Sequence, residues 1–115
     1  MQGEEQIQIR TKVKPLCELL EYQDSSIVSR VLLKNNGGTV TLFAFDQGEG
    51  LSEHTTPFEA LVFVVDGEAE VEIAGEAYRV RSGETITLPA NVPHAVRATA
   101  RFKMLLTMIR ASSKA

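Results

Sequence analysis

Short apolar runs separated by turn residues make up most of this chain. From Ser25 onward, runs rich in Val, Ile, Leu, Thr and Phe alternate with clusters of Gly, Asn, Asp and Pro. The turn clusters recur about every 8 to 12 residues, which predicts roughly seven or more strands and an all-β sandwich or barrel. No helical pattern long enough for a βαβ crossover lies between the runs. Apolar residues at positions 16, 19 and 20 predict one short N-terminal helix within residues 15–22.

Alternation within individual runs predicts which face of each strand is buried. Residues 67–75 alternate glutamates with Ala, Val and Ile, so one face is predicted to be buried and the other to be an acidic, solvated surface. The runs 61–65 and 104–109 are instead apolar on both faces. Strands of this kind need cover on both sides, and we expect a second copy of the chain to supply part of it in a homodimer. Several basic residues are expected to solubilise the surface and to pair with the acidic face: Arg79, Arg81, Arg97, Arg101 and Lys103.

Length and composition limit the classes of function. The 115 residues are 43% apolar and 23% charged, which predicts a single globular domain with an N-terminal segment, residues 1–24, and a barrel core of about residues 25–110. A net charge of -3 with interspersed signs argues against nucleic-acid binding. Residues 1–15 contain no signal-peptide pattern, and no run approaches the roughly 18 apolar residues of a membrane span, so we expect a cytoplasmic protein with no membrane partner. The single Cys17 lies in an apolar patch, which predicts a buried, unreactive thiol.

The only two histidines, His54 and His94, both stand among turn residues at the beginnings of predicted strands. Their settings are Gly48-x5-His54-x-Thr56-Pro57-x-Glu59-Ala60-x6-Gly67 and Gly83-x5-Pro89-x-Asn91-x2-His94. These blocks resemble the two motifs of the cupin superfamily, G-x5-H-x-H-x3,4-E-x6-G and G-x5-P-x-G-x2-H-x3-N. The resemblance covers about half the chain, and it implies a jelly-roll-like barrel, a double-stranded β-helix, with both histidines pointing into its mouth.

The resemblance also implies a metal site with four protein ligands: both histidines and the glutamate of the first motif, and the histidine of the second. His54 and His94 occupy two of these positions, while Thr56 and Ala60 stand where the other two ligands would be. Two imidazoles leave half of the shell of a Mn, Fe, Ni or Zn ion to water, so the pair alone would bind metal weakly. A local bulge that turned Glu59 inward would complete a triad of two histidines and one carboxylate.

Three functions follow from these residues. The preferred one is a binding module, in which a pocket around His54, Thr56, His94 and Met104 holds a small organic ligand. The second is a metal-dependent oxygenase or isomerase, in which His54, His94 and Glu59 hold one divalent Mn, Fe, Ni or Zn ion. The third is a structural protein whose cavity is filled by side chains. The chain contains no Gly-x-Ser-x-Gly, phosphate-binding or dinucleotide motif, which disfavours the common hydrolases, and the fold does not name a ligand.

Overall fold

The computed structural model describes residues 12–111 of the chain. The expectation that residues 1–15 carry no signal peptide concerns mainly residues 1–11, which lie outside this range. Within it, one 3-10 turn precedes eight strands, and no helix is long and apolar enough to cross a membrane. In chain order the elements are η1 (Leu16–Glu18), β1 (Ile27–Asn35), β2 (Gly38–Phe45), β3 (Gly50–His54), β4 (Phe58–Ile73), β5 (Glu76–Arg81), β6 (Thr85–Leu88), β7 (His94–Arg97) and β8 (Phe102–Arg110).

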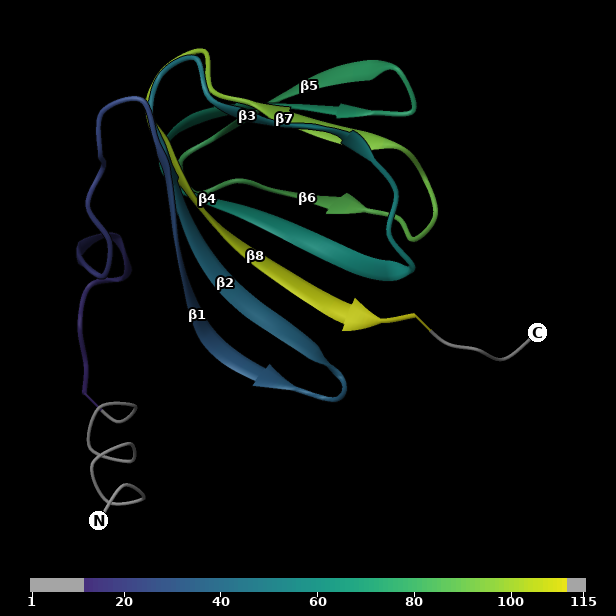
Figure 1. The fold of residues 1–115 in the computed structure, drawn as a ribbon, viewed down its shortest axis with the longest axis horizontal. Helices are drawn as coiled ribbons and strands as arrows, with labels where there is room; N and C mark the ends of the chain where they lie inside the picture. The colour runs from purple at the N-terminus through teal and green to yellow at the C-terminus, as the bar shows by residue number, and fades with distance from the viewer. Residues whose placement is uncertain (1–11, 112–115) are drawn as a thin grey trace.

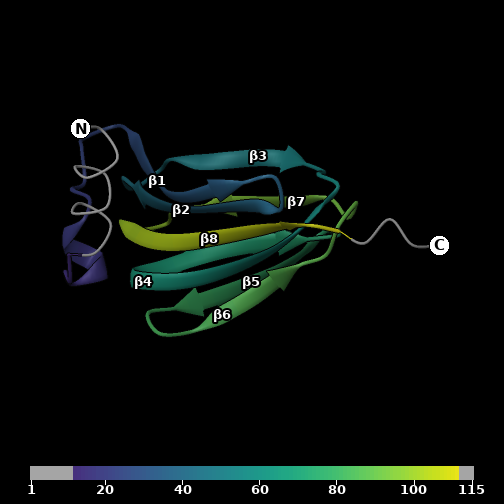
Figure 2. The same cartoon turned by 90° about the horizontal axis from the view of Figure 1, so that it is seen from below.

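The long strand β4 belongs to both of two antiparallel layers. Its first half pairs with β8 and β6, which form the first layer together with β1 and β2. Its second half pairs with β5 and β7, and β3 completes the second layer. The strand changes layer at Gly67, where φ is 79° and a side chain would collide with the Arg101 carbonyl group. The layers converge beside the stretch that contains η1 and diverge toward the end of β8 (Figure 1), while Figure 2 shows the strands of the first layer from below.

The all-β prediction is confirmed, and the main core lies between the two layers. Phe45 and Phe102 are fully buried there, and their rings stack with centroids 4.5 Å apart. The buried face predicted for residues 67–75 is also confirmed, because Ala69 and Val71 belong to this core. Removal of these apolar surfaces from water is the main force that holds the two layers together.

The outer face of the second layer is charged, as the alternating glutamates predict. A Glu68 carboxylate oxygen lies 3.0 Å from Arg79, and the other lies 3.4 Å from Arg81. Glu70 and Glu72 lie on the same face of β4. Exposed ion pairs of this kind contribute at most about 1 kcal/mol each, so this face is a solvated surface rather than a source of stability.

The predicted N-terminal helix is only the single 3-10 turn Leu16–Glu18. Pro15 before it is extended, with ψ 132°, and no side chain caps the turn, so nothing supports the free N–H groups of a longer helix. Leu19 and Leu20 pack instead against the outer face of the first layer. Cys17 is exposed, so the prediction of a buried thiol is wrong: its leucine neighbours take the side of the turn that faces the sheet.

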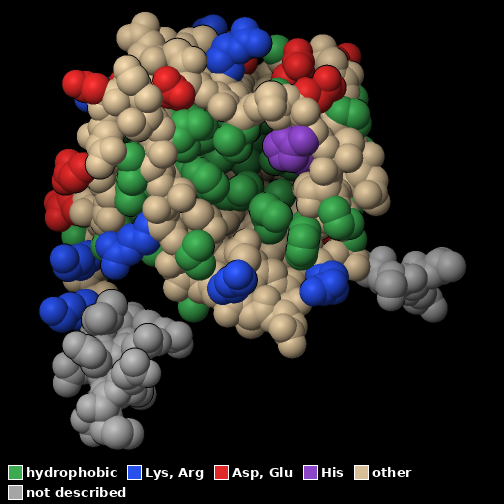
Figure 3. Space-filling view, in the orientation of Figure 1, with side chains coloured by type: hydrophobic (Ala, Val, Ile, Leu, Met, Phe, Trp, Pro, Cys, Tyr) green, Lys and Arg blue, Asp and Glu red, His purple; other side chains and the backbone are tan. Residues whose placement is uncertain are grey.

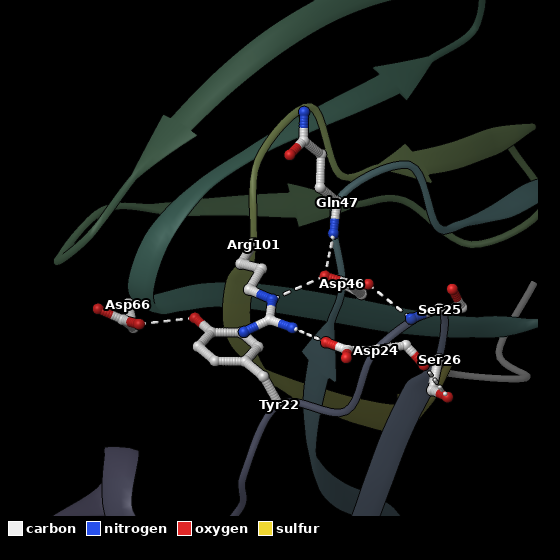
Figure 4. Close-up of polar contacts among 8 residues, drawn as sticks. All are labelled: Tyr22, Asp24, Ser25, Ser26, Asp46, Gln47, Asp66 and Arg101. Atoms are coloured by element: carbon white, nitrogen blue, oxygen red, sulfur yellow. Dashed lines mark hydrogen bonds and ion pairs between the residues drawn. The ribbon is translucent and has the colours of Figure 1, made fainter.

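Polar contacts fasten the segment after this turn to the strands (Figure 4). The Tyr22 hydroxyl donates to Asp66 at 2.6 Å, and Arg101 donates to Asp24 at 2.6 Å and to Asp46 at 2.7 Å. The hydrogen bond from Arg101 and those from two backbone N–H groups lower the pKa of Asp46 to about 2. Burial, together with the hydrogen bond to Asp66, raises the pKa of Tyr22 above its usual value, so this phenol stays protonated. Arg101 therefore joins two acidic side chains of this region instead of pairing with the glutamates of β4.

Lys103 holds the same segment from within the first layer. Its side chain is buried. Its Nζ atom donates to the carbonyl oxygens of Cys17 and Leu20, the latter at 2.7 Å. The same Nζ atom lies 4.9 Å from the centre of the Tyr22 ring. The expectation that Lys103 solubilises the surface is therefore wrong. The stretch from Cys17 to Tyr22 covers it, and backbone carbonyls and an aromatic face replace water around the ammonium group.

Candidate functional site

A mostly apolar cavity of about 220 Å³ lies between the two layers. Figure 3 shows a hollow with green apolar side chains on its floor and a purple histidine surface at its edge. Three residues with polar side chains line this cavity, His54, Thr56 and His94. The remaining lining residues are apolar and come from five strands: Leu51, Ala60, Val62, Leu88, Val96, Met104, Leu106 and Met108.

The two histidines face each other because of how β3 and β7 pair. His54 is the last residue of β3, His94 is the first residue of β7, and the two are directly opposite in the antiparallel register. Their ring centroids are 4.4 Å apart, with the ring planes at 70° to each other. The prediction that both imidazoles meet at the mouth of one barrel is confirmed.

A register shift in β3 decides which face His54 occupies. Leu51 pairs with Val96 and lines the cavity, and strict alternation from Leu51 would direct Glu53 inward and His54 outward. The register shifts by one residue between Leu51 and His54, so the parity is reversed and His54 reaches the inner face. The bulge considered from the sequence alone was a different one, further along the chain near Glu59.

Both imidazole rings are oriented by nearby backbone carbonyl groups. The Nδ1 atom of His54 lies 2.8 Å from the Ser52 carbonyl oxygen, and that of His94 lies 3.2 Å from the Val92 carbonyl oxygen. A carbonyl oxygen only accepts hydrogen bonds, so the Nδ1 atom of each ring carries the proton. In a neutral ring this leaves Nε2 as an unprotonated nitrogen, which can accept a hydrogen bond or coordinate a metal ion.

The two histidines differ in burial. His94 is only 5% exposed, whereas His54 is exposed at the edge of the cavity. Burial lowers the pKa of His94 below its usual 6.5, and the positive charge that His54 can carry lowers it further, against an opposing hydrogen bond to Val92. At neutral pH the His94 ring is therefore uncharged.

Of the other predicted site residues, two face the cavity and one faces the outside of the molecule. Thr56 lines the cavity, and its carbonyl oxygen accepts from the Asn91 N–H at 2.8 Å, which ties the loop before β4 to the loop before β7. Met104 lines the cavity as predicted and is almost fully buried. On β4 it is Ala60 that faces the cavity, while its neighbour Glu59 lies on the opposite, outer face. The structure therefore does not bring Glu59 to the histidines.

The donors that line the cavity do not fit the four-ligand metal site of the resemblance. In the part of the chain that the structure describes, no three His, Cys, Asp or Glu side chains are grouped to hold a metal ion. The reason is local, since β4 continues regularly through Glu59 and places the small Ala60 side chain where a ligand would be needed. The polar groups that line the cavity are therefore two imidazoles and a threonine hydroxyl.

A second hollow lies on the outside of the second layer. This groove of about 480 Å³ is more open, and Glu49, Glu53, Glu70, Glu72 and Arg97 line it. No histidine lines it, and its apolar lining residues, Leu51, Ala95 and Val96, stand beside four glutamates. Two of these, Glu70 and Glu72, belong to the solvated face of β4. Small-molecule sites are mostly apolar with a few convergent polar groups, so the cavity between the layers is the better candidate site.

Sequence reasoning found the polar residues of the cavity but missed part of its wall. Leu51 and Val96 were not singled out, although Val96 lies two residues after His94 and so shares its face. The alternation rule could have found Val96. Leu51 could be assigned only once the register shift in β3 was known.

Comparisons with known proteins agree with this architecture. A family described as "Cupin domain" matches residues 41–109. A conserved protein of unknown function from Streptococcus pyogenes is 34% identical and superposes with a TM-score of 0.85 over 90% of each chain. A Cupin 2 conserved barrel domain protein from Leptotrichia buccalis is 43% identical, with a TM-score of 0.79 over 82% of this chain and 46% of that one.

Among curated proteins, the chain resembles a 5-nitrosalicylic acid 1,2-dioxygenase from a Bradyrhizobium species. The two are 37% identical over 62 residues, which is 54% of this chain and 30% of the dioxygenase. The chain spans less than half the length of the curated relatives that it matches.

Proposed function

The chain belongs to the cupin family, and on this premise we propose that it is a binding module that holds a small organic ligand between its two layers. The observation that carries the proposal is the pair of imidazole rings, His54 and His94, at the edge of an enclosed apolar cavity. An apolar pocket with a few convergent polar groups is the usual form of a small-molecule site. The apolar walls would supply most of the affinity, and the histidines would fix the orientation of the ligand.

Filling the cavity should abolish this binding. We expect Ala60→Leu to weaken the binding of single-ring aromatic compounds at least tenfold, because the larger side chain occupies the space that the ligand needs. Ala77→Leu is the matched control, since Ala77 is exposed on β5 outside the cavity. Binding is measured by NMR chemical-shift titration of the unmodified chain with a panel of such compounds. If no compound shifts the cavity residues, or if Ala60→Leu binds as well as Ala77→Leu, the proposal fails.

A metal-dependent oxygenase or isomerase is the second candidate. The similarity to a protein named as a dioxygenase and the two unprotonated Nε2 atoms favour it. Two protein ligands bind a transition metal weakly, which favours the binding module over the enzyme. Elemental analysis of untagged protein separates them: close to one metal ion per chain, lost in His54→Ala, supports the enzyme, and substoichiometric metal supports the binding module.

We also propose that the chain forms a homodimer through the outer face of the first layer. Among the described residues, the stretch from Leu16 to Tyr22 covers the part of this face around Leu42. Beyond it, the registers align Leu33 and Leu61 on this face, and Ile109 lies on the same face of β8. These three side chains are 59%, 42% and 52% exposed. A second copy related by a twofold axis would place an identical apolar row against this one. A charged partner would not be complementary to such a row.

Charges introduced into this row should separate the two copies. We expect Leu61→Glu with Ile109→Glu to change the mass measured by light scattering from that of a dimer to that of a monomer, because facing carboxylates repel and lose hydration. Tyr78→Glu on β5 is the control, since Tyr78 is also 42% exposed but lies in the other layer. A monomeric parent chain, or a dimer that survives the double change, would show that this face is not the interface.

A further inference from the structure

We infer that the ligand of this cavity is an uncharged molecule of about one ring, such as a phenol, that donates a hydroxyl hydrogen bond to the imidazole nitrogens of His54 and His94. The inference rests on the proposed function and adds the chemical class of the ligand.

The direction of the hydrogen bond follows from the orientation of the two rings. Each Nδ1–H group is already turned to a backbone carbonyl, that of Ser52 or that of Val92. The nitrogen left on each neutral ring, Nε2, is an acceptor and has no proton to give. The ligand therefore has to supply the donor. Thr56 adds to this preference, because its Oγ1 atom accepts from the Phe58 N–H and its own hydroxyl proton remains to be donated to a ligand oxygen.

The absence of charge follows from the composition of the wall. Among the residues that line the cavity, the only titratable side chains are His54 on β3 and His94 on β7, and those of β4, β6 and β8 are apolar. A carboxylate would find no permanently charged cation in the lining, only imidazoles that would have to take up a proton, and an ammonium group would find no anion, so both would enter at a high desolvation cost. Protonation of both rings to receive an anion would place two positive charges on rings whose centroids are 4.4 Å apart.

The size follows from the volume. An apolar cavity of about 150 Å³ holds benzene, and sites for drug-sized ligands begin at about 300 Å³. The 220 Å³ cavity lies between these values, which corresponds to one ring with a small substituent. A hydroxyl group on such a ring is the smallest change that satisfies the donor requirement without adding charge.

Three compounds of similar shape test the inference by calorimetric titration at pH 7.5: 4-ethylphenol, 4-ethylanisole and 4-ethylbenzoate. We expect the phenol to bind at least fivefold more tightly than the ether, which has no donor, and the carboxylate to bind most weakly. The phenol's advantage over the ether should disappear in a His54→Leu, His94→Leu variant. An ether or carboxylate that binds as tightly as the phenol overturns the inference. If these compounds still lose binding in Ala60→Leu, the cavity function stands and only the ligand class is wrong. If none of the three binds, both proposals fall.

Discussion

A chain that carries Thr56→His and Ala60→Glu will bind Zn²⁺ at least about tenfold more tightly than the unmodified chain. Both positions line the same cavity as His54 and His94, so the change adds an imidazole and a carboxylate to two imidazoles that are already oriented. Structural and catalytic zinc sites use three or four protein ligands, and the present pair supplies only two. The two existing rings also lose little freedom on binding, because backbone carbonyls hold their Nδ1 atoms.

Zn²⁺ affinity is measured by competition with a chromophoric chelator at pH 7.5. The matched control is Thr55→His with Leu61→Glu, which introduces the same residue types one position along the chain. Thr55 is exposed and does not line the cavity, and Leu61 lies on the outer face of β4. The control should bind no more tightly than the unmodified chain. If the double change also leaves the affinity at that level, the four positions do not converge on one point, and the assignment of Thr56 and Ala60 as the missing ligands is wrong.

The strands could be predicted from the sequence because they depend on local signals. Alternation in residues 67–75 depends only on which face meets water, and turn residues mark the ends of strands whatever they pair with. The meeting of His54 and His94 was instead implied by the resemblance of their settings to the two cupin motifs. Alternation along β3 would not have given the face of His54, since that face depends on the one-residue shift between β3 and β7.

The position of Glu59 shows the same limit on β4. The sequence offered two readings, a regular strand with Glu59 outward and a bulged strand with Glu59 inward. The structure contains the regular strand here, with the Glu59–Ile109 and Ala60–Met108 pairs both in register with β8. Pairing with a long neighbouring strand favours regularity, because a bulge leaves a backbone group without its ladder partner.

The burial of Lys103 could not be predicted because the carbonyl groups that surround it belong to residues 83 and 86 positions away in the chain. The exposure of Cys17 depends on which side of η1 packs on the sheet, and this is also decided by tertiary contacts. Composition and periodicity report on a residue's own element and not on what folds over it. Lys103 alternates with apolar neighbours on β8 and so occupies the outer face, which would be solvent if the segment around Leu20 did not cross it. Burial of this lysine is thus a tertiary effect, and from it we predict a large change in stability when Lys103 is replaced.

Replacing Lys103 by methionine should lower the free energy of unfolding by about 2 to 3 kcal/mol. Methionine keeps the apolar stem but removes the donors that satisfy the carbonyl oxygens of Cys17 and Leu20, and it removes the cation from the Tyr22 ring. The methionine variant no longer has to desolvate a charged ammonium group, and this favours the variant. In the unmodified chain, however, the two carbonyl acceptors and the aromatic face already offset that desolvation cost. Urea unfolding measures the difference, and Lys34→Met on the exposed end of β1 should stay within about 0.5 kcal/mol of the unmodified chain. Limited proteolysis should then cut Lys103→Met first in the segment around Leu20. If stability is unchanged or higher, desolvation cancels the hydrogen bonds, and the apolar contacts of the leucines alone hold the segment on the first layer.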